Sequence, residues 1–207
     1  MWDFYYAPQT ISLASHIALL DAGADFRPHR LDFSTQEHQK GAYAALNPKL
    51  RVPTLVTPDG TLTETPAILT FIAQKFPQAA LVPLDPFDFA KVQEFCSYIA
   101  STLHVAHAHR MRGHRWVDPA NTAAIQAMQD KVPEAVTAAF QHIENTARFG
   151  PFVMGDTYTI ADPYLYTVAQ WIKSDGVAPG ALPKVEAHFA MMGPRDTVQA
   201  ARATQAA

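Results

Sequence analysis

The sequence contains a single cysteine, Cys96, among its 207 residues. One cysteine excludes an internal disulfide, a CxxC redox pair and a cysteine-based zinc site. No apolar run approaches the ~20 residues that a membrane-spanning helix needs, and the N-terminus shows no signal-peptide pattern. We therefore expect a cytoplasmic protein without a membrane partner. The formal net charge of −3 gives no reason to expect nucleic acid as a partner.

The first 76 residues alternate strand and helix patterns. Pro28 favours a sheet edge for the second strand, because proline cannot donate to a strand ladder. Asp59-Gly60 between two short apolar runs predicts a hairpin. Thr65 is expected to cap the next helix, with Pro66 at its first position. Strands are expected at 2–6, 26–33, 54–57 and 61–63, and helices at 12–22, 35–46 and 65–75.

The rest of the chain shows helical patterns only, after a proline-rich linker at residues 77–86. We expect helices at 87–111, from Asp118 to Gly150 with a kink or break at Pro133, at 160–174, at 183–192 and from Pro194. The alanine-rich tail after Ala200 is expected to fray. The predicted fold class is an α/β domain of order βαβαββα at residues 1–76, followed by an all-α domain at residues 87–207.

Two polar motifs lie in the helical half. Thr159 and Asp162 predict a capping box, in which each side chain bonds the other residue's backbone N–H. The segment LHVAHAHRMRGHR is rich in histidine, which invites a metal interpretation. At ~100° per residue, however, His104 and His107 share a helix face and His109 points elsewhere. With no cysteine or nearby carboxylate to complete a ligand set, we expect no metal.

Three stretches together resemble the soluble glutathione transferases, specifically the bacterial beta-type members. They are YYAPQTISLASHIAL, NPKLRVPTLVTPDGTLTETPAI and GDTYTIADPYLY, and they occur in the family's order and spacing. The resemblance covers nearly the whole chain. It implies a thioredoxin-like domain at residues 1–76 that binds glutathione, and a helical domain at residues 87–207 that holds the electrophile.

The resemblance also implies which residues bind glutathione as a co-substrate. A cis Val52–Pro53 bond would present the Val52 backbone to the tripeptide as an added strand would. Glu64 and Thr65 would hold the γ-glutamyl ammonium and carboxylate, although Thr65 fits simple helix capping equally well. Lys49 and Arg51 would face the glycyl carboxylate, or form a solvated surface pair.

The family's beta-type members carry a cysteine in the first turn, where this chain has Ile11. The thiolate of glutathione would then need other donors, and we rank Ser12 first, Thr10 second and a tyrosine of the first strand third. Ser12 as a plain helix cap is the alternative. The resemblance places His104 opposite the thiol. The electrophile pocket would consist of Ile11, His104, His107 and Met111.

The leading hypothesis is therefore a glutathione transferase that conjugates small hydrophobic or anionic electrophiles. The basic flank of Arg110, Arg112 and Arg115 favours an anionic substrate, although cations also suit a solvated helix end. A glutathione-dependent reductase or isomerase, and a non-catalytic ligand-binding member, are the alternatives. The resemblance implies a homodimer.

Overall fold

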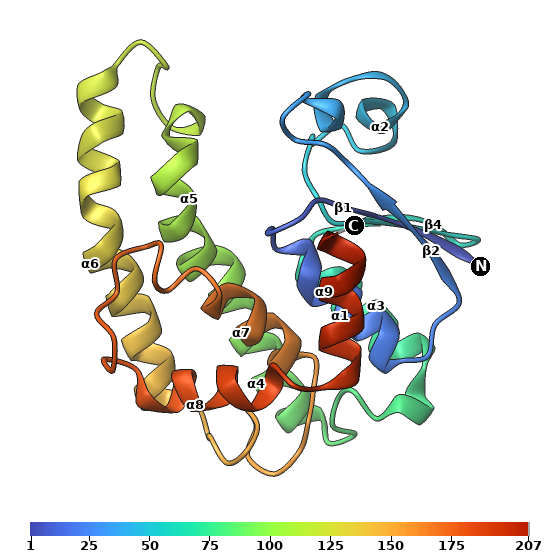
Figure 1. The fold of residues 1–207 in the computed structure, drawn as a ribbon. Helices are drawn as coiled ribbons and strands as arrows, with labels where there is room; N and C mark the ends of the chain where they lie inside the picture. Colours follow the sequence, from blue (N-terminus) through green and yellow to red (C-terminus); the bar gives the residue numbers. More distant parts are fainter. Residues whose placement is uncertain (207) are drawn as a thin grey trace.

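A computed structural model describes residues 1–206 of the chain. Figure 1 shows an α/β part beside a larger helical part. The α/β part has the expected order, although β2 ends three residues early and the expected helix at 35–46 is a 3₁₀ turn followed by a short helix. Its elements are β1 (Trp2–Tyr6), α1 (Ser12–Asp21), β2 (Phe26–Arg30), η1 (Glu37–Gln39), α2 (Gly41–Leu46), β3 (Thr54–Thr57), β4 (Gly60–Thr63) and α3 (Thr65–Lys75).

The four strands form one mixed sheet in the order β2-β1-β3-β4. β1 pairs parallel to β2 and antiparallel to β3, and β3 pairs antiparallel to β4 through the expected hairpin. Pro28 lies in β2, an edge strand, as predicted. α1 and α3 lie on one side of the sheet and α2 on the other (Figure 1), which is a thioredoxin-like arrangement.

The helical part begins with what the sequence predicts as one long helix. It is α4 (Pro86–Tyr98), a π-helical turn η3 (Ile99–Leu103) and α5 (His104–Arg112). The Asp85 carboxylate accepts hydrogen bonds from the Phe87 and Asp88 N–H groups and so caps α4. Single π turns inside helices occur often at functional sites. Here the π turn directly precedes His104.

The helix expected from Asp118 to Gly150 is shorter in the structure, as α6 (Thr122–Thr146). Asp118 accepts from the Ala120 N–H in a turn, and Asn121 caps the helix by accepting from the Ala124 N–H at 3.1 Å. Of the kink or break expected at Pro133, the break does not occur, because α6 continues through this residue. The buried side chains of Val132 and Val136 on either side hold this segment against the core, which offsets the cost of the lost hydrogen bond.

A 3₁₀ turn, η4 (Gly113–Arg115), follows α5, and the C-terminal helices after α6 are α7 (Ala161–Ala169), α8 (Pro183–Met192) and α9 (Asp196–Ala206). α7 ends five residues before the predicted Ser174, and α8 matches its prediction. The expected frayed tail is wrong, because α9 packs on α1 (Figure 1). Ala201 is buried in that contact, and the Tyr6 hydroxyl donates to the Thr204 carbonyl at 3.0 Å.

The predicted capping box at the start of α7 forms only in part. The Asp162 carboxylate accepts from the Thr159 N–H at 2.7 Å, as expected. The Thr159 hydroxyl accepts from the Ala161 N–H and not from Asp162, because the Asp162 N–H bonds the Thr159 carbonyl. The buried Asp162 also accepts from the Val153 N–H at 2.9 Å and contacts His188 Nε2 at 3.0 Å.

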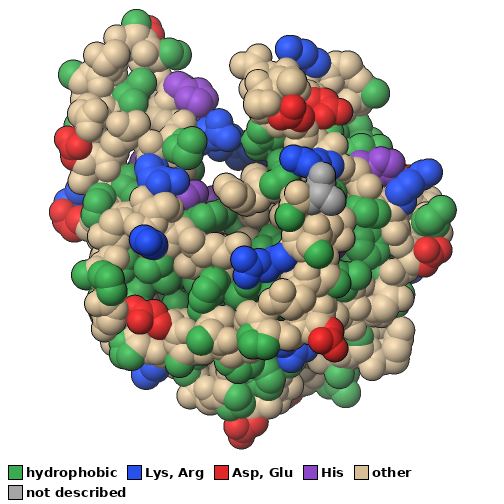
Figure 2. Space-filling model, in the orientation of Figure 1, with side chains coloured by type: hydrophobic (Ala, Val, Ile, Leu, Met, Phe, Trp, Pro, Cys, Tyr) green, Lys and Arg blue, Asp and Glu red, His purple; other side chains and the backbone are tan. Residues whose placement is uncertain are grey.

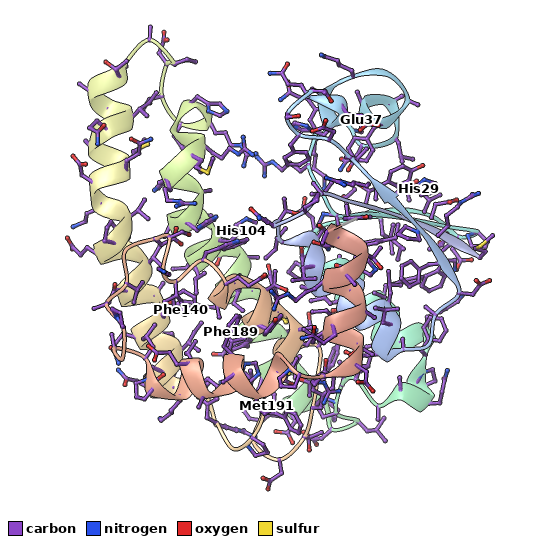
Figure 3. All side chains as sticks on the ribbon, viewed as in Figure 1. His29, Glu37, His104, Phe140, Phe189 and Met191 are labelled. Carbon is purple, nitrogen blue, oxygen red and sulfur yellow. The ribbon has the colours of Figure 1, made fainter. Side chains whose placement is uncertain are left out.

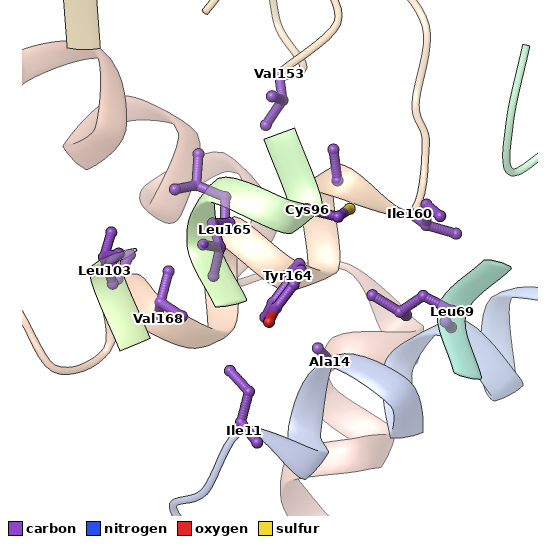
Figure 4. Close-up of a cluster of buried hydrophobic side chains, with 14 of the residues drawn as sticks. Ile11, Ala14, Leu69, Cys96, Leu103, Val153, Ile160, Tyr164, Leu165 and Val168 are labelled. Carbon is purple, nitrogen blue, oxygen red and sulfur yellow. The ribbon is translucent and has the colours of Figure 1, made fainter. Parts of the chain in front are cut away.

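One continuous core joins the α/β part to the helices. Figure 4 shows Ile11, Ala14 and Leu69 from the first domain packed towards Tyr164 and Cys96 from the second. Burial raises the pKa of the Cys96 thiol to about 12. A fully buried thiol with so high a pKa is a packing residue, because the reactive form of cysteine is the thiolate.

His16 is a buried histidine of α1 that packs against the rings of Phe4, Tyr6 and Phe26. Burial lowers its pKa from 6.5 to about 4. Between pH 4 and pH 6.5, the unfolded chain therefore binds more protons than the folded chain. The neutral histidine contributes stability above pH 6.5, and this contribution is lost as the pH falls towards 4. We expect His16→Leu to reduce the acid-induced loss of stability, measured by urea unfolding at pH 7 and pH 4.5. The surface variant His142→Leu is the control and should lose as much stability as the wild type. An equally large loss in His16→Leu would contradict this assignment.

Candidate active site

A cleft lies between the two domains, and side chains from both line it (Figure 2). Its floor comes from the first turn, from the segment before β3, and from the β4–α3 junction. Its opposite wall comes from η3, α5, η4 and α7. The lining residues are Ile11, Asn47, Lys49, Arg51, Val52, Pro53, Thr63, Glu64, Thr65, Pro66, Ala100, His104, Val105, Ala108, Arg115, Trp116 and Tyr164.

The Val52–Pro53 peptide bond is cis, as the sequence resemblance implied. Two buried side chains fix the segment before it. The Tyr43 hydroxyl and the Asn47 amide both donate to the Arg51 carbonyl, the latter at 2.7 Å. Sequence reasoning did not single out Tyr43 or Asn47, although Asn47 opens the second family-like stretch. The network holds the Val52 backbone in place at the floor of the cleft.

Glu64 and Thr65 lie at the cleft where β4 meets α3. The predicted cap by Thr65 is wrong, because Thr65 is the first helical residue and Glu64 precedes it without a side-chain cap. Glu64 has φ 73°, a value that non-glycine residues rarely adopt and that is found most often at functional sites. Because no side chain caps α3, its first N–H groups have no side-chain acceptor. A helix N-terminus of this kind suits an anion.

The Glu64 carboxylate pairs with the Lys49 ammonium at 2.5 Å. Lys49 also donates to the Thr63 hydroxyl. Both side chains of the ion pair are largely exposed, so a ligand can displace the pair at small cost. Arg51 is exposed beside them.

The first turn brings Thr10 and Ser12 together. Their hydroxyl oxygens are 2.7 Å apart, and the Ala7 carbonyl lies 2.7 Å from the Thr10 oxygen and 3.1 Å from the Ser12 oxygen. Neither residue is among those that line the cleft; Ser12 is fully buried, whereas Thr10 is half-buried. Ile11, in place of the family's cysteine, lines the cleft between them. Ser12 is also not the helix cap, since Ile11 occupies that position without a capping side chain.

The two tyrosines of β1 point away from the cleft. Tyr6 is buried and its hydroxyl is bonded to α9. Tyr5 stacks on His29 with the ring centroids 4.6 Å apart. Neither lines the cleft, and the hydroxyl of Tyr6 and the ring of Tyr5 both have partners elsewhere.

His104 lines the opposite wall of the cleft, and Figure 3 shows it on the side of α5 that faces the first domain. Its ring lies 5.4 Å from that of Trp171. Burial, with smaller contributions from His107, Arg115 and Arg51, lowers the pKa of His104 to about 4. The imidazole is therefore neutral at pH 7, and one of its nitrogens can donate a hydrogen bond while the other accepts.

His107 and Met111, the other two predicted pocket residues, do not line this cleft. His107 stacks on Trp171 at 3.9 Å and contacts the buried Asp175 carboxylate at 2.7 Å through Nδ1. Arg110 joins the same carboxylate at 3.3 Å. Met111 is exposed. The sequence spacing placed His107 one turn beyond His104, but Trp171 and Asp175, from the segment that follows α7, cover the His107 side chain.

Within residues 1–206, no three histidine, cysteine, aspartate or glutamate side chains are grouped so that they could hold a metal ion. Three histidines of the 103–115 segment pack on tryptophans: His104 and His107 on Trp171, and His109 on Trp116 at 4.4 Å. No helix in the same described range is both long and apolar enough to cross a membrane.

Comparison with known proteins assigns both parts of the chain. The glutathione S-transferase N-terminal domain family matches residues 3–74, and the C-terminal domain family matches residues 98–196. Glutathione S-transferase GstA of Escherichia coli O157:H7 is 31% identical over 198 residues, which cover 94% of each chain. A maleylacetoacetate isomerase of Pseudomonas aeruginosa is 28% identical over 187 residues, which cover 88% of this chain and 86% of the relative.

Solved structures indicate the same family. A glutathione transferase homologue from Sulfitobacter, crystallised with bound glutathione, is 41% identical with a TM-score of 0.94, covering 99% of this chain and 98% of the other. A glutathione S-transferase from Xylella fastidiosa is 27% identical with a TM-score of 0.88, covering 100% of this chain and 99% of that one. The two domain matches, the relatives and the cleft between the domains lead to one conclusion: the chain belongs to the glutathione S-transferase family.

Proposed function

We propose that this protein is a glutathione transferase that joins the thiolate of glutathione to small electrophiles in the cleft between its domains. The observation that carries the proposal is the arrangement of the cleft. A polar floor from residues 1–76 offers the Val52 backbone and the Glu64–Thr65 junction. The opposite wall from residues 87–207 offers His104 and apolar side chains. The Sulfitobacter homologue, crystallised with bound glutathione, supports glutathione as the ligand.

Glutathione binding follows from the charges on the floor. The γ-glutamyl carboxylate would sit at the N-terminus of α3, where the Thr65 N–H and hydroxyl are free of side-chain partners. The ammonium on the same carbon would bond Glu64, which releases Lys49. The Val52 backbone would pair with the cysteinyl residue, and Lys49 and Arg51 would receive the glycyl carboxylate.

The thiol would then lie beside Ile11, and the first turn must supply its donor. Each hydroxyl has one proton. The Thr10 hydroxyl donates to the Ala7 carbonyl at 2.7 Å. If buried Ser12 donates to the Thr10 oxygen, Thr10 would turn its proton from that carbonyl to the sulfur. This order reverses the sequence-based ranking, because Ser12 is enclosed and Thr10 is partly exposed. We propose Thr10 as the direct donor, Ser12 as the residue that orients it, and neutral His104 as a donor from the opposite wall.

Isomerisation is the second candidate. Two relatives are named maleylacetoacetate isomerase and maleylpyruvate isomerase, at 28% and 30% identity. The arginines of the cleft would suit such acidic substrates. A family member that binds glutathione without catalysis is the third. The missing first-turn cysteine argues against disulfide reduction.

Calorimetry followed by turnover separates these candidates. We expect glutathione to bind, and 1-chloro-2,4-dinitrobenzene to be conjugated faster than without enzyme. Binding without turnover of this electrophile, but with cis–trans conversion of a maleyl-type acid, would favour the isomerase. Binding with neither reaction would favour the non-catalytic alternative, and no binding would overturn all three.

Glu64→Gln tests how the floor binds glutathione. Removing the carboxylate should weaken glutathione binding about tenfold, because a charge-assisted bond to the ammonium is lost. Titration calorimetry measures this, with Glu134→Gln as the control, since Glu134 is an exposed glutamate on α6 that also pairs with a lysine. Equal affinities for the wild type and Glu64→Gln would remove Glu64 from the proposed site.

We also propose that the protein is a homodimer, as the family resemblance implies. Sedimentation velocity should give a mass of twice 22.8 kDa at micromolar concentration. A monomer that retains turnover would contradict this proposal and leave the assignment of the active site unaffected.

A further inference from the structure

Two arginines line the cleft from opposite domains. Arg51 precedes the cis peptide bond on the floor, and Arg115 ends η4 on the opposite wall. Arg112, at the end of α5, lies one turn before Arg115. Figure 2 shows Lys and Arg side chains at the mouth of the hollow between the tip of α5 and the α/β domain.

The positive charge in the cleft exceeds the negative charge. Glu64 is the only acidic residue among those that line the cleft, and it pairs with Lys49. Over the described range of residues 1–206, neither Arg51 nor Arg115 has an acidic partner within ion-pair distance. Arg110, by contrast, is paired with Asp175. The arginines at the mouth of the cleft are thus a distinct group with no counter-charge.

These arginines also repel one another. The pKa of the Arg115 guanidinium is lowered by partial burial and, to a lesser degree, by Arg51 and Arg112. Like charges held together without a carboxylate destabilise the free protein, and a bound anion would relieve that repulsion. Such an arrangement fits a site that binds an anion.

Glutathione alone does not account for all of this charge. Its two carboxylates would lie on the floor, at the N-terminus of α3 and beside Lys49 and Arg51. Arg115 lies on the wall that the electrophile would contact, next to Trp116 and the small apolar residues Val105 and Ala108. An electrophile with a flat apolar body and one anionic group would match both features of that wall.

We infer that Arg115, supported by Arg112, binds a carboxylate carried by the electrophile, so that this enzyme prefers anionic aromatic or unsaturated electrophiles to neutral ones. The inference rests on the proposed transferase function and names its substrate class. With 4-chloro-3,5-dinitrobenzoate as the probe, the glutathione sulfur would form a bond to the ring carbon that carries chlorine. Chloride would leave with the electrons of the broken C–Cl bond, and the thiol proton would pass to solvent.

The test compares this probe with its methyl ester, which has the same ring but no charge. We expect the wild type to show a KM about fivefold to tenfold lower for the acid than for the ester. Arg115→Gln should remove that difference, with little change in the KM of the ester, and Arg115→Lys should keep part of it. Arg27→Gln is the matched control, because Arg27 lies near the N-terminal end of β2 and pairs with Asp3.

Three results would overturn the inference. The first is equal KM values for acid and ester in the wild type. The second is a preference that survives in Arg115→Gln. The third is a loss of glutathione affinity in Arg115→Gln by calorimetry, which would assign Arg115 to the glycyl carboxylate instead.

A failure of the transferase proposal is distinguishable from these results. If neither probe reacts, the glutathione conjugates of the acid and of the ester, made chemically, are titrated into the protein. Tighter binding of the charged conjugate to wild type than to Arg115→Gln would support the anion site without turnover. Equal binding of the two conjugates, or no binding, would overturn the site.

Discussion

Replacing Asp162 with alanine is expected to lower the free energy of unfolding by about 3–5 kcal/mol. The Asp162 side chain is fully buried and accepts from the Val153 and Thr159 N–H groups, and it also contacts His188 Nε2. Alanine would leave two buried backbone donors and a buried imidazole without a partner. Each such group carries a desolvation cost that nothing in the interior offsets.

Urea unfolding at pH 7 measures this effect. Asp156→Ala is the control, because Asp156 is an exposed aspartate of the same loop and should change stability by about 0.5 kcal/mol or less. Asp162→Asn keeps the shape and one acceptor oxygen, so its loss of stability should lie between those of Asp156→Ala and Asp162→Ala. A loss in Asp162→Ala no larger than that in Asp156→Ala would show that the network does not stabilise the fold.

Replacing Thr10 with valine is expected to lower kcat/KM about tenfold to thirtyfold at pH 7. A free thiol has a pKa of about 8.5, so only a few per cent is thiolate at pH 7, and full ionisation gains about thirtyfold. Valine has the shape of threonine without the hydroxyl. The pKa of bound glutathione, measured by ultraviolet thiolate absorbance, should rise towards 8.5, and the difference in rate should shrink above that pH.

Thr10→Ser is the matched control, since it keeps the hydroxyl, and it should retain most of the activity. Ser12→Ala should lower the rate less than Thr10→Val, because buried Ser12 acts on the sulfur only through Thr10. A larger loss in Ser12→Ala, or an unchanged thiol pKa in Thr10→Val, would restore the ranking that the sequence suggested.

The proposed mechanism also places His104 at this step, from the other domain. With a pKa of about 4, it stays neutral over the whole range in which the thiol ionises. A neutral imidazole can donate a hydrogen bond to sulfur without competing with it for a proton. The activity of the enzyme near neutral pH should therefore follow the ionisation of the glutathione thiol and not that of His104.

Local patterns predicted most of the elements that surround the site. The strand and helix periods placed β1, α1, β3, β4 and α8 within one or two residues, because each has a clear apolar face and a definite start or stop signal. Pro28 predicted an edge strand, and the family-like stretch predicted the cis bond at Val52–Pro53. The break considered at Pro133 and the frayed end expected after Ala200 were wrong, because burial against neighbouring helices outweighed local propensity.

By itself, the sequence determined the fold class, the family and the chemistry that is excluded from the first turn. These depend on residue types at fixed spacing, and Ile11 in place of cysteine is visible without coordinates. Only the tertiary structure decided which side chains reach the cleft. Ser12 and His107 have the right spacing along the chain, yet Ser12 is enclosed by its own turn and His107 stacks on Trp171. Exposure and charge balance arise from packing between distant segments, and no local pattern encodes them.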